Sequence, residues 1–375
     1  MDTVTTAIGG ALLGRALPED QRGPHGVLVV TLASVVPDTD MIFGAFSNNP
    51  LSGLTLHRAV THSLLGAAIL GPLLALAFWR FGKDKKYSRL LLLFLLGLFW
   101  HMFTDLATSW GTMIYYPFNR NRVVWDLLFI IDFTFSAILL LPHVVAWTYD
   151  RPQQALRRGG LAWAALVAFT ALVISLVSPI FRVGFNWGLL GLLCAALGLL
   201  FLLPRIGGWG FRASSAKFCR IGVASLAFYL TVCTVAHFRA VGLVEDIARE
   251  KELNVRSLGA LPQPLSPFRW TGLVLTPDGV YQSWFDLLDN DARRFEFFPT
   301  AENEYVERAR QIPTVQTYLW FARFPVARYR NEGGRHIVDF GDRRFQSQDD
   351  RDPGFVYRVV FDSAGKVLSN GFPGR

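Results

Sequence analysis

Two short polar clusters in this chain carry the residue types of a metal site. The first is the segment 57–63, His-Arg-Ala-Val-Thr-His-Ser, and the second is 101–105, His-Met-Phe-Thr-Asp. Each lies at one end of a strongly apolar segment, where ionisable residues are rare and usually functional. Because imidazole nitrogens and carboxylate oxygens bind zinc and similar divalent metals, the clusters indicate metal-dependent chemistry.

The spacing inside each cluster decides how its side chains can converge. His101 and Asp105 are four residues apart, so on a helix they lie on one face, one turn apart. His57 and His62 are five apart, which separates them by about 140° on a regular helix. We therefore expect His57 to lie in a loop and a helix to begin near residues 61–63.

Three aspartates at the ends of other apolar segments extend this set. Asp38 and Asp40 follow Pro37 after the short apolar run 26–36, and Asp132 lies at the start of a later one. The expected metal ligands are Asp38, Asp40, His57, His62, His101, Asp105 and Asp132. A catalytic zinc takes about three protein ligands and a water, so this set suffices for one or two ions. A two-metal site can also clamp a phosphoryl group.

Other polar residues nearby have expected roles around such a metal. An uncoordinated Asp38 or Asp40 is expected to act as general base. Arg58, Arg120 and Arg122 lie nearby in sequence, and guanidinium matches phosphate oxygens. Of these, Arg58 or Arg120 is expected to hold an anionic substrate group. The simpler reading is that His-x-x-x-Asp recurs by chance and that aspartates cap helices. On that reading Asp126 is structural and complements a helix dipole.

The apolar segments place the first two thirds of the chain in a membrane. Hydrophobic residues make up 51% of the sequence and charged residues 18%, against about 25% charged in soluble proteins. The charge deficit lies in residues 1–243. Six segments approach the roughly 20 apolar residues that a spanning helix needs: 63–82, 89–107, 125–148, 161–181, 183–204 and 219–242. Residues 4–16 and 26–36 are apolar but shorter, and we expect them to form short helices, either as a re-entrant or interfacial hairpin or as two thin spans.

The loops between these segments predict an orientation. Successive loops contain 5, 2, 3, 1 and 4 Lys or Arg residues, so alternate loops are richer. Since Lys and Arg favour the cytoplasmic side, the polar clusters are expected to face the periplasm or the cell exterior. Much of the net charge of +8 lies in these loops, so it does not indicate a nucleic-acid partner.

Residues 244–375 have the composition of a soluble domain. Residues 270–276 and 280–288 flank Pro-Asp-Gly and are expected to form a hairpin. Further strands are expected at 327–331, 335–340 and 355–361, with a helix over 301–322 capped by Thr300. The predicted fold is mostly α. It has a polytopic transmembrane helical bundle over 1–243 and a C-terminal extramembrane α+β domain over 244–375 on the outer side.

The ordered motifs resemble those of one known family. They are Met-Asp-Thr-Val-Thr at residues 1–5, Pro-Asp-Thr-Asp at 37–40, the two clusters with Leu-Ala-Thr-Ser-Trp-Gly-Thr at 106–112, Pro-Phe at 117–118, Trp-Asp at 125–126 and Ile-Asp at 131–132. Over residues 1–145 this resembles the YdjM/YbcI-type inner-membrane proteins, which are described as metal-dependent hydrolases and compared with zinc-dependent phospholipase C. One position departs from the family, because Thr6 stands where its motif usually has His.

The resemblance implies a multi-pass protein of the bacterial inner membrane. It implies metal-activated water acting on an ester or phosphoester of a membrane lipid or lipid-linked substrate, with Zn²⁺ as the expected cofactor. The C-terminal domain is expected to cap the site or bind a protein partner. The alternative is a non-catalytic membrane scaffold with a structural or degenerate metal site. A lipid phosphatase, a metalloprotease and a transporter fit less well, since their motifs or midplane sites are missing from the sequence.

Overall fold

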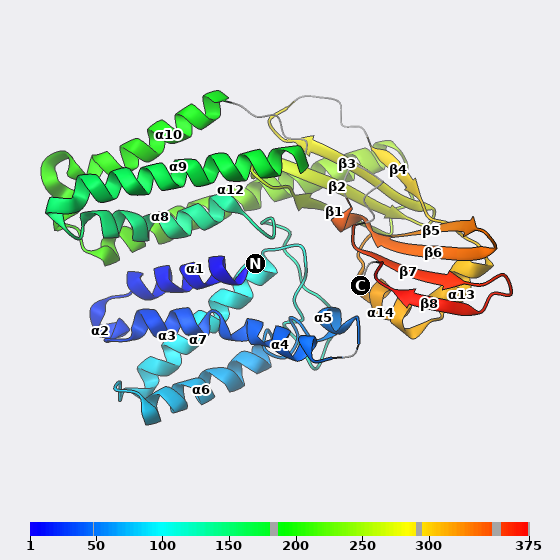
Figure 1. Ribbon diagram of the computed structural model, residues 1–375, viewed down its shortest axis with the longest axis horizontal. Coiled ribbons are helices and arrows are strands. Elements are labelled where there is room, and N and C mark those ends of the chain that lie inside the picture. Colours follow the sequence, from blue (N-terminus) through cyan, green and yellow to red (C-terminus); the bar gives the residue numbers. More distant parts are fainter. Residues whose placement is uncertain (48, 181–186, 290–294, 347–353, 374–375) are drawn as a thin grey trace. The chain divides into compact units, whose positions relative to one another are not determined.

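The computed structural model describes residues 1–47, 49–180, 187–289, 295–346 and 354–373 (Figure 1). These residues form two compact units that are interleaved in sequence. The first, here called the helical unit, contains residues 1–36, 68–101 and 132–230. The second, here called the mixed unit, contains residues 37–67, 102–131 and 231–375. The predicted domain boundary at 243/244 stays a prediction.

The helical unit consists of apolar helices joined by short connections. Its helices are α1 (Thr3–Ala16), α2 (Glu19–Arg22), α3 (Gly26–Ala33), α8 (Phe133–Tyr149), α9 (Ala155–Ile180), α10 (Trp187–Leu202), α11 (Trp209–Arg212) and most of α6 (Leu64–Phe81), α7 (Tyr87–Leu106) and α12 (Ser215–Glu250), with 3-10 turns at Pro152–Gln154 and Leu203–Gly208. Val29 and Val30 of α3 pack against Leu93 and Phe94 of α7 in one buried core. The short N-terminal helices expected at 4–16 and 26–36 are thus confirmed.

Within the described residues, four helical segments are long and apolar enough to cross a membrane. They are Leu64–Phe81, Tyr87–Leu106, Pro152–Leu176 and Ser215–Glu250. Two shorter apolar helices, Phe133–Tyr149 and Leu190–Ile206, correspond to the other expected spans, so the count of six stays a prediction. The expected span at 125–148 begins at Phe133 instead, because Asp132 accepts the hydrogen bond that caps this helix. Part of the expected span 183–204 lies outside the described residues.

The mixed unit opens with short helical pieces and two loops. Its first elements are the 3-10 turn η1 (Val36–Thr39), α4 (Asp40–Ala45) and α5 (Ser52–Thr55). Residues 56–63 form turns, and a longer loop follows α7 over residues 107–131. The last turn of α7, from Met102, and the C-terminal half of α12, from Thr231, also belong to this unit.

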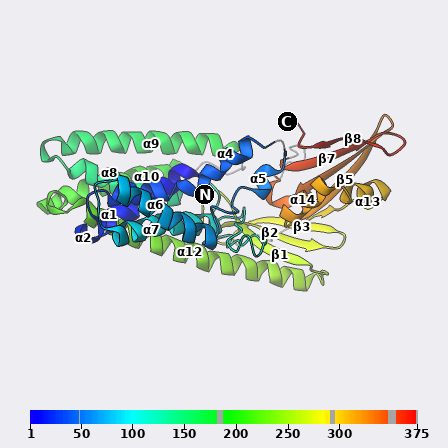
Figure 2. The ribbon, with the colours of Figure 1, turned by 90° about the horizontal axis from the view of Figure 1, so that it is seen from below.

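The rest of the mixed unit is built on two antiparallel four-stranded sheets (Figures 1 and 2). The first contains β1 (Ser257–Pro262), β2 (Arg269–Thr276), β3 (Gly279–Asp286) and β4 (Glu296–Pro299), and the second contains β5 (Pro325–Glu332), β6 (Arg335–Asp342), β7 (Val356–Phe361) and β8 (Val367–Gly371). Each sheet is a meander in sequence order. Gly333 and Gly334 have φ of 58° and 79°, which two-residue hairpin turns require.

The predicted strands are confirmed, but the predicted single helix over 301–322 is two helices. They are α13 (Glu304–Arg310) and α14 (Pro313–Phe321). Pro313 lacks the N–H that would continue the first helix and instead occupies the first turn of the second. Asn303 caps α13, while the hydroxyl of Thr300 accepts a hydrogen bond from Ala327 N. The expectation that Thr300 is the cap was therefore wrong.

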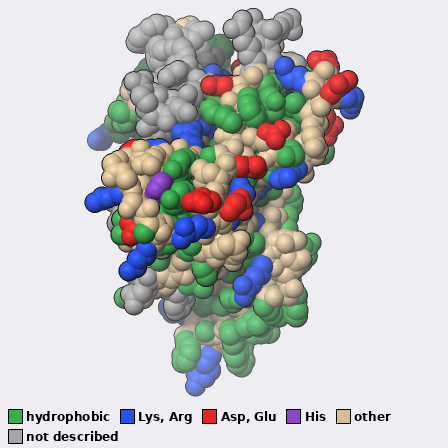
Figure 3. All heavy atoms as spheres, turned by 90° about the vertical axis from the view of Figure 1, so that its right-hand side faces the viewer, with side chains coloured by type: hydrophobic (Ala, Val, Ile, Leu, Met, Phe, Trp, Pro, Cys, Tyr) green, Lys and Arg blue, Asp and Glu red, His purple; other side chains and the backbone are tan. Residues whose placement is uncertain are grey.

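One hydrophobic core joins the second sheet to the loop-rich part of the mixed unit. Tyr318 and Phe321 of α14 are buried there with Phe340 of β6. Leu51 and Leu54, at α5, are buried in the same core and are only 1% and 4% exposed. On the face that Figure 3 draws, acidic and basic side chains are interspersed.

Candidate metal centre

The turn that carries the two histidines of the first cluster leads directly into a helix. Helix α6 begins at Leu64, and the hydroxyl of Ser63 accepts a hydrogen bond from Gly66 N at 2.9 Å. This is the geometry of an N-cap. His57 therefore lies in a turn and the helix begins just after residue 63, as the five-residue spacing predicted.

Asp40 at the start of α4 connects most of this turn. Its Oδ1 lies 2.8 Å from His57 Nδ1, and its Oδ2 lies 3.1 Å from His62 Nδ1. Oδ2 also accepts hydrogen bonds from Arg58 N at 3.1 Å and from the Thr61 hydroxyl at 2.9 Å. Burial alone would raise the pKa of Asp40, but the hydrogen bonds and charges of His57 and His62 hold it well below its usual range. Asp40 is thus a carboxylate that orients two imidazole rings.

The other edge of the His62 ring faces two more carboxylates. His62 Nε2 lies 3.6 Å from Asp38 Oδ1 and 3.4 Å from Asp105 Oδ2. His62 is fully buried, and the Asp38 side chain is 11% exposed. Because Asp40 holds Nδ1, the Nε2 atom is the nitrogen placed to bind a cation.

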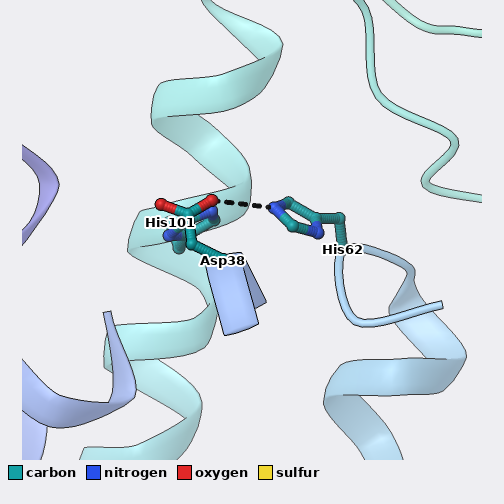
Figure 4. Close-up of side chains that lie close together, drawn as sticks. All are labelled: Asp38, His62 and His101. Atoms are coloured by element: carbon teal, nitrogen blue, oxygen red, sulfur yellow. Dashed lines mark ion pairs between the residues drawn. The ribbon is translucent and has the colours of Figure 1, made fainter. Parts of the chain in front are cut away.

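His101 completes a group of three possible ligands, one carboxylate and two imidazoles (Figure 4). One ligand atom each from Asp38, His62 and His101 lies within 4.8 Å of the others. Helix α7 carries both His101 and Asp105, so their relative positions are fixed by one helical turn. His101 Nδ1 lies 2.7 Å from the carbonyl of Ser34, which orients its ring in the way typical of metal-binding histidines.

A second group of three overlaps the first at His62. It contains Asp40, His57 and His62. In this group the distance of 2.8 Å between Asp40 and His57 Nδ1 is that of a hydrogen bond. The other oxygen of Asp40 contacts His62 Nδ1, so each carboxylate oxygen already faces an imidazole nitrogen. The set of Asp38, His62 and His101 fits a divalent metal better, because nitrogen and oxygen ligands from separate elements face one another there.

Arg58 lies inside the cluster and holds Asp105. Its Nη2 is 2.9 Å from Asp105 Oδ1, and its Nη1 donates to the Thr108 hydroxyl at 3.2 Å. The residue is 3% exposed. Arg58 thus positions a carboxylate, which favours that role over the predicted contact with substrate. Arg120 is exposed in the 107–131 loop. Both substrate-binding roles stay predictions.

The charges of the cluster favour a divalent cation. Three buried or nearly buried carboxylates, Asp38, Asp40 and Asp105, face one guanidinium, that of Arg58. The carboxylates in this cluster therefore outnumber the guanidinium that contacts Asp105. Since uncompensated charge in a buried site is costly, a bound dication would stabilise this arrangement.

Both carboxylate oxygens of Asp132, the remaining predicted ligand, have partners among the described residues. Asp132 Oδ1 accepts from Phe135 N at 2.9 Å, and its Oδ2 accepts from the Tyr229 hydroxyl at 2.9 Å. Neither ligand group includes Asp132. Asp126 pairs with Arg323 at 3.0 and 2.9 Å, in agreement with the expected structural role. The hydroxyl of Thr6 donates to the Asp2 carbonyl at 3.0 Å.

Three residues that were not predicted to support the site contact its side chains or its backbone. Thr61 bonds both Asp40 and His62, and Thr108 bonds Arg58. Arg122 donates to the backbone of the turn at His57. Burial, followed by the charges of Arg58 and Arg344, lowers its pKa to about 9, so it is still charged at neutral pH. Thr61 lay inside the first cluster. Arg122 was noted as a nearby arginine suited to phosphate, but its bonds to the histidine turn were not predicted.

The candidate ligands lie in the part of the chain that matches a known family. Residues 1–183 match the family of the YdjM inner membrane protein. The recognition made from the ordered motifs is thus confirmed, and the match includes every candidate ligand. The YdjM region and the apolar helices together identify a membrane protein.

A curated relative and the solved structures add little about activity. The chain is 28% identical over 153 residues to a Bacillus subtilis (strain 168) protein described as the uncharacterized protein YfhP. The match covers 39% of this chain and 45% of that relative, so the chain spans less than half of the relative's length. No solved structure matches the chain. The function must therefore be argued from the site.

Proposed function

We propose that this protein is a membrane-bound metal-dependent hydrolase. The observation that carries the proposal is the group of Asp38, His62 and His101, whose ligand atoms lie within 4.8 Å of one another. Zn²⁺ is the proposed ion, because two imidazoles with carboxylates are typical of catalytic zinc sites. When bound, such a metal activates water and polarises an acyl or phosphoryl oxygen.

The residues around the ligands have distinct proposed tasks. Asp40 keeps His57 and His62 in the ring orientation that directs Nε2 of His62 toward the other ligands. Arg58 fixes Asp105 beside the ligand group. Asp38 has the more accessible carboxylate of the pair Asp38 and Asp105, at 11% against 1% exposure of the side chain. Asp38 is therefore the more accessible carboxylate of the two, which suits a ligand of a metal that water must reach. The general-base role expected of an uncoordinated Asp38 or Asp40 stays a prediction.

The proposed substrate is an ester or phosphoester of a membrane lipid or a lipid-linked molecule. Support comes from the apolar helices that carry the ligands, since α6 follows His62 directly and α7 contains His101. The proposed location is the bacterial inner membrane, with several spans and the site on the periplasmic or outer side. The alternation of Lys and Arg between loops supports that orientation.

Metal content and turnover test this proposal together. The full-length protein is purified in detergent, and bound zinc per chain is measured by mass spectrometry for wild type, His62→Ala and His101→Ala. His336→Ala is the matched control, because His336 lies on β6 and pairs with Tyr329. We expect about one ion per wild-type and control chain and a loss of most of it in both site variants.

The same preparations are assayed on phospholipids, phosphodiesters and carboxylic esters. Hydrolysis by wild type that is lost in His62→Ala and His101→Ala supports the hydrolase. Equal metal content in all four proteins would refute the site. Full metal content with no turnover on any substrate would favour the second candidate, a membrane scaffold with a structural metal.

A further inference from the structure

The turn that carries His57 and Arg58 is bonded to the 107–131 loop through the backbone. Met113 N donates to the carbonyl of Arg58 at 3.0 Å, and Leu64 N donates to the carbonyl of Ile114 at 2.9 Å. Inside the loop, Thr112 and Val123 exchange two hydrogen bonds at 3.0 and 2.9 Å. The position of this turn therefore depends on the position of the loop.

Arg122 lies beside the Thr112–Val123 pair and bonds three carbonyls. Its Nη1 donates to Gly111 O at 2.8 Å, and its Nη2 donates to Leu54 O and, at 3.3 Å, to His57 O. These carbonyls belong to the loop, to α5 and to the histidine turn. One planar guanidinium, with five donors in a fixed geometry, thus links all three segments.

The same guanidinium lies against two aromatic rings of α14. Its Cζ is 5.2 Å from the ring centre of Phe321 and 5.4 Å from that of Trp320. Cations within about 6 Å of an aromatic ring are attracted by it. The side chain that bonds the histidine turn is therefore held by the C-terminal part of the chain.

Three further contacts join the 107–131 loop to the C-terminal part. Arg323 forms a two-bond ion pair with Asp126, at 3.0 and 2.9 Å. Arg344 donates to the carbonyl of Ser109 at 2.8 Å. Trp110 packs against Phe321 with ring centres 4.9 Å apart. Together with the buried Leu51 and Leu54, these contacts make the loop part of the core around the second sheet.

We propose that Arg122 is a positioning residue for the metal site, through which α14 of the C-terminal region fixes the His57 turn. The proposal rests on the metal site of the proposed function. It gives the C-terminal region a task that lies outside the YdjM match, which ends at residue 183.

The effect passes from Arg122 to the ligands by contacts described above. Arg122 fixes the carbonyl of His57, and the His57 ring bonds Asp40 at 2.8 Å. Asp40 in turn holds Nδ1 of His62 at 3.1 Å. Loss of Arg122 frees the turn, so His62 loses its fixed orientation and metal affinity falls. Changes to groups that orient metal-binding histidines usually cost about 10- to 100-fold in affinity.

The test measures zinc affinity of the full-length protein by competition with a chelator, for wild type, Arg122→Gln, Arg122→Lys and Trp320→Ala. We expect Arg122→Gln to lose about 10- to 100-fold, and Arg122→Lys to lose less, because its ammonium keeps the charge but makes fewer fixed bonds. Trp320→Ala removes one ring from an exposed position and is expected to weaken zinc binding by a smaller factor than Arg122→Gln. It keeps the test decisive if Arg122→Gln does not fold.

Arg308→Gln is the matched control. Arg308 also lies over two rings, those of Tyr305 and Phe361, and donates to the carbonyl of Gly365 at 2.5 Å. Its partners among the described residues all belong to the C-terminal region, so it reports general loss of stability there. We expect Arg308→Gln to bind zinc as wild type does.

A second measurement separates positioning from stability. The visible absorption of Co²⁺ bound in place of zinc reports ligand geometry, and we expect it to change in Arg122→Gln but not in Arg308→Gln. Wild-type affinity and an unchanged Co²⁺ spectrum in the Arg122 and Trp320 variants would refute the positioning role. If the wild-type protein binds neither metal, the proposed function itself fails, which is a different outcome.

Discussion

At the scale of single residues, the two successive peptides around Arg58 are held from several sides. Asp40 accepts its N–H, Met113 donates to the carbonyl of Arg58, and Arg122 donates to that of His57. Arg58 has φ of +62°, a left-handed conformation that costs a non-glycine residue about 1–3 kcal/mol. Such strain persists only where the surroundings fix it, and it is typical of functional sites.

The buried ion pair of Arg58 and Asp105 is expected to contribute to stability. Arg58→Met leaves the Asp105 carboxylate, which is 1% exposed, without its cation. We expect the metal-free variant to lose about 3–5 kcal/mol of unfolding free energy, measured by chemical denaturation in detergent. We also expect zinc to stabilise the variant more than wild type, because a dication replaces the missing charge.

Arg58→Lys serves as the control for that experiment, because it keeps a cation near Asp105 and should lose less stability than Arg58→Met. An equal zinc-induced gain in wild type and in Arg58→Met would show that the ion does not interact with Asp105.

At the scale of elements, the features predicted correctly from the sequence are those that depend on one short segment of chain. His101 and Asp105 converge because one helix carries both, and the histidine turn was expected because a spacing of five does not fit a helix. The pairing of Arg323 with Asp126 spans 197 residues, and no local pattern encodes such a contact. For the same reason Arg122 was not recognised as a support of the site, and its partners on α14 were not foreseen.

The start of α8 shows how two roles of an aspartate can be confused in a sequence. A carboxylate at the end of an apolar segment suits both a metal and a helix N-terminus, and Asp132 caps the helix. The short strands β1 and β4 were missed, because β1 contains Gly and Pro and β4 has only four residues. The two hairpins were found because one turn carries Pro-Asp-Gly and the other Gly-Gly.

Because Asp132 caps α8, its replacement is expected to change stability. We expect Asp132→Ala to lower the unfolding free energy by about 0.5–2 kcal/mol, and to lose the bond with Tyr229 as well. Asp132→Asn should keep most of the stability, since Asn caps helices as well as Asp does. Thermal unfolding in detergent and zinc content are measured together. A fall in bound zinc in both variants would instead make Asp132 a ligand, as first predicted from the sequence.

At the scale of the whole molecule, the part outside the family match shares a core with the part inside it. Leu51 and Leu54 lie within residues 1–183, and they are buried with Tyr357 and Phe340 of the second sheet. Burial of each such side chain contributes about 1.5–3 kcal/mol to the stability of the folded state. The C-terminal region is therefore bound to the segment that carries the metal ligands, and both must lie on the same side of the membrane.

Cysteine labelling in intact cells tests on which side that is. The loop at 80–89 has five Lys or Arg residues and is expected in the cytoplasm, which puts the mixed unit outside. Native Cys219 and Cys233 are buried, so Cys194→Ala gives a suitable background. We expect Glu302→Cys, which is exposed before α13, to react with a membrane-impermeant maleimide in intact cells. Lys83→Cys, exposed after α6, should react only after lysis. The reverse pattern would place the metal ligands on the cytoplasmic side and exclude a substrate presented from the outer leaflet.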